Sequence, residues 1–148
     1  MRVVAPTFTV GAMCFIERGD GDLLLVRHVY RDRWGVPGGL LSAGEDAGDG
    51  ARREVLEEVG LAIDLVGEPR VVVDAEPRRV DIIYQARPAA GADPDAVAPG
   101  SPEISETRWF SREDLPELQH ETVAALVALA RAESAAGVDL EVNLPRVP

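Results

Sequence analysis

The chain of 148 residues contains no lysine, and all 15 of its basic side chains are arginines. The missing lysine excludes three kinds of chemistry: a Schiff base to substrate, a lysine general base and the lysine of a phosphate-binding loop. Cysteine is scarce as well. The single residue, Cys14, cannot form a disulfide within the chain, so nothing in the sequence indicates an oxidising compartment.

Long apolar runs are also missing. No stretch approaches the roughly 20 apolar residues of a membrane-spanning helix, and the first residues lack the apolar core of a signal peptide. We therefore expect a cytoplasmic protein with no membrane partner. The 26 acidic residues give a net charge of −11, which argues against binding to a nucleic-acid polymer. The length fits one domain over residues 1–148.

The order of the expected elements predicts an α/β fold. Their β-branched and aromatic residues predict strands over residues 7–17, 23–29, 61–74, 80–87 and 104–110. An Asp-Gly pair between the first two strands favours a hairpin turn, so we expect these two strands to pair.

Apolar residues spaced by three or four predict helices over residues 49–59 and within 113–136. Between the strands and helices, the glycine-rich segment 35–44 is expected to be an irregular loop. Residues 88–102 are expected to form a surface loop, and residues 137–148 a C-terminal tail.

Three glutamates, Glu54, Glu57 and Glu58, share one face of the first helix. Like charges at this spacing repel, and a divalent cation would relieve the repulsion, because carboxylate oxygens are hard ligands that suit Mg²⁺ or Mn²⁺. Arg53 precedes Glu57 by four residues and could orient it. Taken alone, this run of charges is typical of an ordinary solvated helix face, so the surrounding residues decide the interpretation.

The segment from Gly39 to Leu61 resembles the signature of the Nudix hydrolase family. Every fixed position of that signature is filled, in the order Gly39, Glu45, Arg53, Glu54, Val55, Glu57, Glu58, Gly60 and Leu61. A chance match of this kind is on the order of one in a million for such a chain. The resemblance implies the Nudix α/β/α sandwich, with a mixed sheet between helices.

The resemblance also implies an activity. Family members use Mg²⁺, for which Mn²⁺ can substitute, to cleave a nucleoside diphosphate linked to another moiety by attack of water on phosphorus. Glu57 and Glu58 would be the principal metal ligands, with Glu54 as a further ligand or a base and the carbonyl of Gly38 as a backbone ligand. Four residues would support the structure of this signature, called the box below: Gly39, Glu45, Arg53 and Gly60.

Outside the box, candidate residues are fewer and have plain structural alternatives. Glu103 is our candidate for an additional catalytic carboxylate, with Glu106 as the alternative, although both could simply solvate a strand edge. Arg27 could contact a substrate phosphate or base. Two aromatic residues could stack on a nucleobase, although aromatic residues near a core more often pack inside it. These are Trp34 and Tyr84.

The small-molecule nucleotide substrate is left open by the sequence. Pro77 lies sixteen residues beyond Leu61, where family members that cleave ADP-ribose often carry a proline, but a turn is expected there too. ADP-ribose or a related nucleotide sugar therefore stands beside an oxidised nucleoside triphosphate. A non-catalytic nucleotide sensor is the remaining alternative, which the complete box disfavours. Dimers are common in the family, so a homodimer also stays open.

Overall fold

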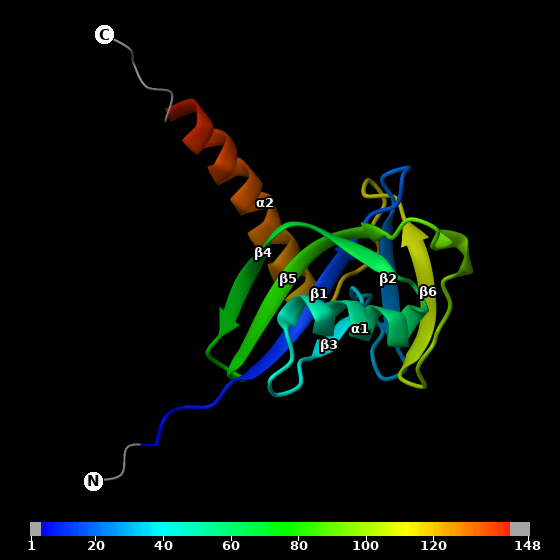
Figure 1. The fold of residues 1–148 in the computed structure, drawn as a ribbon, viewed down its shortest axis with the longest axis horizontal. Helices are drawn as coiled ribbons and strands as arrows, with labels where there is room; N and C mark the ends of the chain where they lie inside the picture. The colour runs from blue at the N-terminus through cyan, green and yellow to red at the C-terminus, as the bar shows by residue number, and fades with distance from the viewer. Residues whose placement is uncertain (1–3, 143–148) are drawn as a thin grey trace.

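The computed structural model describes residues 4–142, with side chains described up to residue 135. Along the chain the strands and helices follow one another as Figure 1 shows. They are β1 (Thr9–Ile16), β2 (Leu23–His28), β3 (Gly38–Leu40), α1 (Ala47–Val59), β4 (Ile63–Asp74), β5 (Arg79–Pro88), a short 3₁₀ helix (Pro94–Ala96), β6 (Ile104–Phe110) and α2 (His120–Val142).

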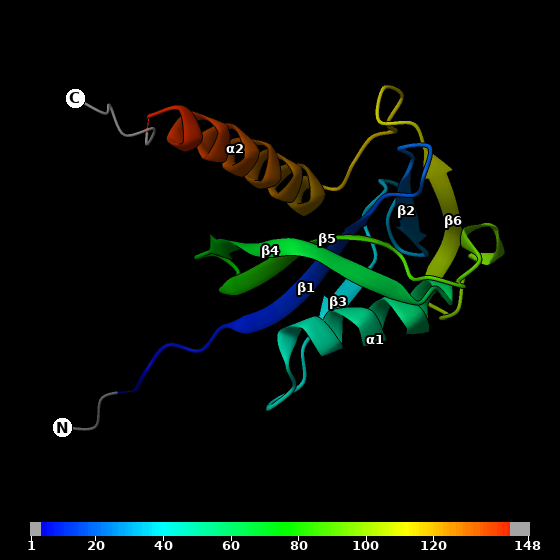
Figure 2. The same ribbon diagram turned by 45° about the horizontal axis from the view of Figure 1, so that its top comes forward.

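Four strands form a mixed sheet in the order β3-β1-β5-β4. Strands β1 and β5 run parallel, while β3 and β4 run antiparallel to their neighbours. The two helices lie on opposite faces of this sheet, as Figure 2 shows, and β2 pairs with β6 in a separate antiparallel sheet. The α/β/α sandwich with a mixed sheet between helices is therefore confirmed.

Strand β1 is apolar on both faces because each face meets a different core. Ala12, Cys14 and Ile16 belong to the cluster that packs with α1. Met13 and Phe15 belong to a second cluster, which includes Ala125 and Leu129 of α2. The strand thus holds the two halves of the molecule together from the middle of the sheet.

Helix α1 is capped at both ends by residues suited to these positions. Asp46 accepts a hydrogen bond from the backbone N–H of Asp49 at 3.0 Å, which satisfies one of the free donors of the first turn. Gly60 ends the helix in the left-handed region, with φ 71°, and its N–H donates to the carbonyl of Leu56. These caps fix the start and the end of the segment that carries the glutamates.

The prediction that the first two strands pair in a hairpin is wrong. The turn itself forms, with the N–H of Gly21 donating to the carbonyl of Arg18, but β1 and β2 share only the bridge between Glu17 and Leu23. Strand β2 pairs instead with β6, from Leu23 opposite Phe110 onwards. Side chains of β2 pack in both hydrophobic clusters. Long-range packing, and not the adjacent turn, therefore determines the position of β2.

The glycine-rich segment 35–44 contains a strand where an irregular loop was expected. Residues Gly38 to Leu40 pair with β1, and a Cβ on Gly38 would overlap the carbonyl oxygen of Ala12. The glycines of segment 35–44 therefore allow two backbones to approach closely, in addition to allowing a turn.

The second helix begins inside the expected range but after Leu118, whose spacing had suggested a place on its apolar face. Residues 117–119 run alongside Trp34, whose N–H donates to the carbonyl of Glu117 and whose carbonyl accepts from the N–H of Gln119. Helix α2 begins only at His120 and reaches Val142, so residues 137–142 are helical where a tail was expected. Residues 143–148 of that tail lie outside the described part. No helix in the described part is long and apolar enough to cross a membrane.

Candidate active site

A cavity of about 410 Å³ lies where the Nudix-like segment meets the sheet and the start of α2. Five of the residues singled out in the sequence line it: Gly38, Gly39, Glu54, Glu58 and Glu103. They come from β3, α1 and the residue before β6, so the fold brings together residues as far apart in the chain as Gly38 and Glu103. The volume is within the range of small-molecule sites.

Glu58 is the most perturbed carboxyl group of this cavity. It accepts a hydrogen bond from the N–H of Gly38 at 3.3 Å. Burial raises the pKa of Glu58 to about 8, and the negative charges of Glu54, Glu103 and Glu57 act in the same direction. The hydrogen bond from Gly38 acts against the shift but does not offset it. The protein's own groups therefore leave the negative charge around Glu58 largely uncompensated.

Arg53 organises the other carboxylates of the segment. It binds both oxygens of Glu45, through Nε at 2.7 Å and Nη2 at 2.9 Å. Its Nη1 donates to Glu54 at 3.0 Å and reaches Glu57 at 3.3 Å. A planar guanidinium has enough donors to serve three carboxylates at once. Arg53 therefore fixes the loop before α1 against the helix, and with it the carboxylate of Glu54.

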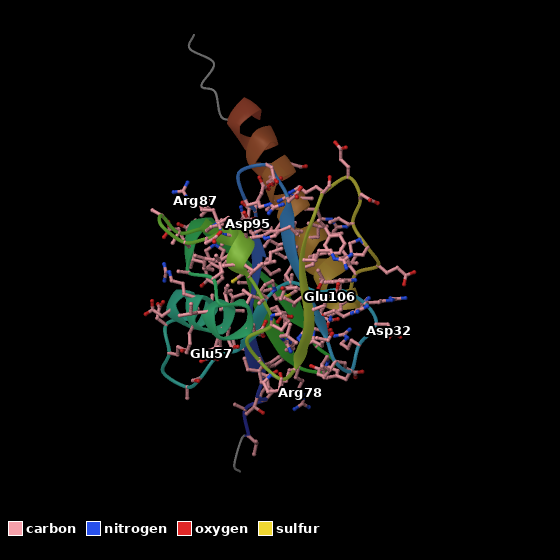
Figure 3. All side chains as sticks on the ribbon, turned by 90° about the vertical axis from the view of Figure 1, so that its right-hand side faces the viewer. Asp32, Glu57, Arg78, Arg87, Asp95 and Glu106 are labelled. Atoms are coloured by element: carbon pink, nitrogen blue, oxygen red, sulfur yellow. The ribbon has the colours of Figure 1, made fainter. Side chains whose placement is uncertain are left out.

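The three clustered glutamates differ in their surroundings. Glu54 and Glu58 line the cavity, whereas Glu57 stands outside the lining and is 59% exposed. Figure 3 labels Glu57 on α1. In the part of the chain that the structure describes, no three acidic, histidine or cysteine side chains converge enough to hold a metal ion alone. A cation here would take further ligands from water or substrate, as Mg²⁺ usually does.

Of the two acidic candidates beyond the box, only Glu103 lies at the cavity. Its carbonyl accepts a hydrogen bond from the N–H of Val29, and this bond joins the start of β6 to the end of β2. Glu106 forms ion pairs with Arg27, at 2.7 Å, and with Arg108. The sequence could not separate these two glutamates, but the structure places them in different environments.

The candidates for substrate binding outside the box do not line this cavity. Arg27 pairs with Glu106 and lies over the ring of Trp34. Trp34 is only 7% exposed and packs edge-on against Phe110, with ring centroids 4.9 Å apart. Tyr84 is buried in the cluster beside α1. The structure thus places both aromatic residues in the cores, so their packing accounts for them without a nucleotide.

Sequence reasoning missed the two arginines of the cavity, Arg31 and Arg79. Arg31 lines it and forms an ion pair with Glu121 at the start of α2. Arg79 lines it too, and its Nε lies 2.8 Å from Oδ1 of Asp81. Asp81 carried a signal, because a charged residue interrupts the apolar run of β5. Nothing in the sequence connects Arg31 with Glu121, which lies 90 residues further on.

Comparison with known proteins shows what the chain as a whole is similar to. A model of the NUDIX domain matches residues 7–129. A MutT-like protein of Streptomyces ambofaciens is 27% identical over 119 residues, which are 80% of this chain and 74% of that protein. Diphosphoinositol polyphosphate phosphohydrolase 3-beta of Bos taurus is 48% identical over 50 residues, only 30% of its length.

Solved structures agree in fold. A MutT NUDIX hydrolase from Burkholderia pseudomallei superimposes with a TM-score of 0.68, is 28% identical and covers 83% of this chain, which spans 98% of it. An ADP-ribose pyrophosphatase from Streptococcus suis has a TM-score of 0.63 and is 27% identical over 84% of this chain and 93% of its own. The chain belongs to the Nudix hydrolase family, whose members act on phosphoric anhydride bonds of small nucleotide substrates and generally use a divalent metal.

Proposed function

We propose that the chain is a Mg²⁺-dependent pyrophosphohydrolase, which cleaves a nucleoside diphosphate linked to another moiety by attack of water on phosphorus. The observation that carries this proposal is the shared cavity of Glu54, Glu58 and Glu103. Three carboxylates around a space of small-molecule size offer the hard oxygen ligands that Mg²⁺ prefers, and Mn²⁺ would be an acceptable substitute.

The charge balance of the site fits a divalent cation. Burial, together with the negative charges of Glu54, Glu103 and Glu57, raises the pKa of Glu58 to about 8. A cation bound at Glu58 and Glu54, with the carbonyl of Gly38 and the exposed Glu57 as further proposed ligands and water or substrate completing the set, would supply the compensating positive charge. When bound, Mg²⁺ polarises phosphoryl oxygens and makes a bound water more acidic.

The protein's own groups have distinct roles in the proposed reaction. Glu103, from a separate element, faces the same cavity and is the proposed acceptor of the proton of the attacking water, with Glu54 as the second choice. Arg53 keeps Glu54 in place through its hydrogen bond of 3.0 Å. Arg31 and Arg79 line the same cavity, each paired with one carboxylate, and their remaining N–H groups are the proposed donors for an anionic substrate.

For the substrate we favour ADP-ribose or a related nucleotide sugar. The support is the similarity, at 27% identity over 84% of this chain, to a protein described as an ADP-ribose pyrophosphatase. Pro77 adds nothing to this choice, because it lies in the exposed turn between β4 and β5 and does not line the cavity. An oxidised nucleoside triphosphate remains the alternative substrate.

The test is a phosphate-release screen with Mg²⁺, Mn²⁺ or no metal. The panel contains ADP-ribose, other nucleotide sugars, dinucleoside polyphosphates, and normal and oxidised triphosphates. We expect turnover that requires a metal, is fastest with ADP-ribose and falls by orders of magnitude in Glu58→Gln. The control Glu113→Gln, on an exposed loop far from the box in sequence, should behave as wild type. A preference for triphosphates would overturn the substrate, whereas tight nucleotide binding without any turnover would favour the non-catalytic sensor.

A further inference from the structure

The loop between β5 and β6 is held against the end of α1, although the sequence predicts only a surface loop there. A helix ends with backbone carbonyls that have no partner inside it. In α1 the carbonyl of Glu58 accepts a hydrogen bond from the N–H of Gly100 at 2.7 Å, and the carbonyl of Val59 accepts one from the N–H of Ala98 at 3.3 Å. The loop therefore satisfies the backbone of the same helical turn that carries Glu57 and Glu58.

Gly100 lies closer to α1 than a residue with a side chain could. A Cβ at this position would be 2.5 Å from the carbonyl oxygen of Glu57 and 3.3 Å from that of Glu58. Both oxygens belong to the backbone of a helix, so neither can rotate away as the end of a side chain can. The φ of Gly100 is not positive, so alanine could adopt the same backbone conformation. The close contact alone therefore requires glycine here.

Glu103 follows Gly100 by three residues, in a segment with little freedom. The N–H of Ile104 donates to the carbonyl of Ser101 at 3.1 Å, and the N–H of Glu103 donates to Oγ of Ser101 at 3.3 Å. The carbonyl of Glu103 accepts from the N–H of Val29 at 2.9 Å. These bonds form a tight turn between Gly100 and β6, so a shift of the backbone at Gly100 is passed on to Glu103.

The contact at Gly100 links two carboxylates of the cavity. Glu58 and Glu103 both line it, and their negative charges repel each other. Their spacing must therefore be set by the backbones that carry them. The hydrogen bond between Gly100 and Glu58 joins these two backbones directly, and Figure 2 shows the end of α1 beside the start of β6.

Of the two partners in this contact, the loop is the one that can move. Helix α1 is capped by Asp46 and Gly60, and its Val59 is fully buried in the core. Gly100, in contrast, is exposed. A side chain at position 100 would therefore displace the loop, and with it Glu103, while the helix keeps its place.

We propose that Gly100 is a positioning residue for the hydrolysis: its close contact with the end of α1 sets the place of the Glu103 carboxylate relative to Glu58. The inference rests on the proposed function, in which Glu103 accepts the proton of the attacking water. A proton acceptor must lie within hydrogen-bonding reach of that water, and a misplacement of about 1 Å can lower a rate about a hundredfold. Gly100 itself does not line the cavity.

The first test is the kinetics of Gly100→Ala, with Mg²⁺ and ADP-ribose or whichever substrate the screen identifies. We expect kcat to fall by about ten- to a hundredfold. The KM should stay within about twofold of wild type, because the proposed substrate donors Arg31 and Arg79 are untouched. Gly19→Ala is the matched control: Gly19 lies in an exposed turn where a Cβ would meet no atom within 4 Å, so its kcat should be that of wild type.

A double-mutant cycle shows whether Gly100 acts through Glu103. It compares the kcat values of wild type, Gly100→Ala, Glu103→Gln and the variant with both substitutions. Once the carboxylate is gone, the substitution of Gly100 has nothing left to misplace. The double variant should therefore have the kcat of Glu103→Gln to within about twofold. A merely structural effect of Gly100→Ala would instead multiply with that of Glu103→Gln.

Hydrogen exchange tests the contact itself without any turnover. The amide of Gly100 is bonded to the carbonyl of Glu58, so in the wild type it should exchange more slowly than the amide of Gly19, although both residues are exposed. In Gly100→Ala the amide at position 100 should lose this protection. Thermal denaturation of the same samples shows that the variant is folded.

A second variant changes the spacing and keeps the contact. One glycine inserted between Ser101 and Pro102 lengthens the path from Gly100 to Glu103, so kcat should fall as in Gly100→Ala. The inference is overturned if Gly100→Ala turns over like Gly19→Ala, if the losses multiply in the cycle, if the insertion leaves kcat unchanged, or if the Gly100 amide exchanges as fast as that of Gly19. A wild type without turnover would instead overturn the proposed function, and the role of Gly100 with it.

Discussion

Arg53 binds both carboxylate oxygens of Glu45, with Nε 2.7 Å from Oε2 and Nη2 2.9 Å from Oε1. Glu45 lies in the loop before α1, and Arg53 lies in the helix itself. Glu45 also accepts a hydrogen bond from the N–H of Ser42 at 3.1 Å. This ion pair therefore ties the loop that follows Gly39 to the helix that carries the glutamates, and its loss should be measurable in stability as well as in activity.

The pair makes acid stability depend on Glu45. Its hydrogen bonds with Arg53 and Ser42 lower the pKa of Glu45 from 4.5 to about 2 in the folded chain. The stabilisation is therefore fully present above about pH 4.5 and is lost as the pH falls towards 2. Chemical denaturation of wild type and Glu45→Gln at several pH values should give a gap in unfolding free energy that narrows over this window. A gap independent of pH would contradict the assignment.

Glu103 and Glu106 should respond differently to the same substitution. Glu103→Gln removes a carboxylate from the cavity, so we expect a large fall in kcat with the fold retained. Glu106→Gln breaks a partly exposed ion pair with Arg27, which should cost less than about 1 kcal/mol of stability and change kcat little. Steady-state kinetics and thermal denaturation of both variants provide the measurement. Equal losses of kcat in the two variants would remove Glu103 from its proposed role.

Gly38 and Gly39 are neighbours whose substitution should have different effects. A Cβ on Gly38 would overlap the backbone of Ala12, which cannot move alone, so Gly38→Ala should lower stability by about 1–3 kcal/mol. A Cβ on Gly39 would lie 2.5 Å from Cδ of Glu54, a side chain that can be displaced. Gly39→Ala should therefore reduce turnover more than stability. Denaturation curves and kcat values, measured on both, would show whether the two effects separate.

Cys14 should be inert in the folded protein. Burial is the main reason that the pKa of its thiol is raised to about 12, and reaction with alkylating reagents requires the thiolate. Labelling with iodoacetamide at neutral pH should be negligible without denaturant and complete when the chain is unfolded. Rapid labelling of the folded protein would show that β1 opens far more often than its burial in the α1 cluster implies.

The sequence predicted well those parts of the structure that depend on residues close to one another in the chain. The limits of β6 agree with the expected strand 104–110, and Gly60 ends α1 as expected. The fixed spacing of the box, whose residues lie within one loop and one helix, brought Glu54, Glu58 and Gly39 to the same cavity. These features depend on contacts between residues close in sequence, where periodicity and capping rules apply.

The parts that failed depend on partners far along the chain. Strand β2 pairs with β6, some 80 residues later, because packing on both cores outweighs a favourable turn. Residues 117–119 are held beside Trp34 by backbone hydrogen bonds, so Leu118 lies outside the helix that its spacing suggested. The ion pair of Arg31 with Glu121 in the cavity was missed for the same reason, since the two residues meet only in the folded chain.

The alternation of β1 between two cores makes chain length in that strand a strict constraint. Ala12 and Cys14 face one helix and Met13 and Phe15 face the other, so inserting or deleting a single residue would exchange small side chains for large ones on both sides at once. The fold can tolerate single substitutions in β1, but it cannot tolerate the insertion or deletion of one residue there. Among natural variants of this chain we therefore expect β1 to differ in residue type while its length stays fixed.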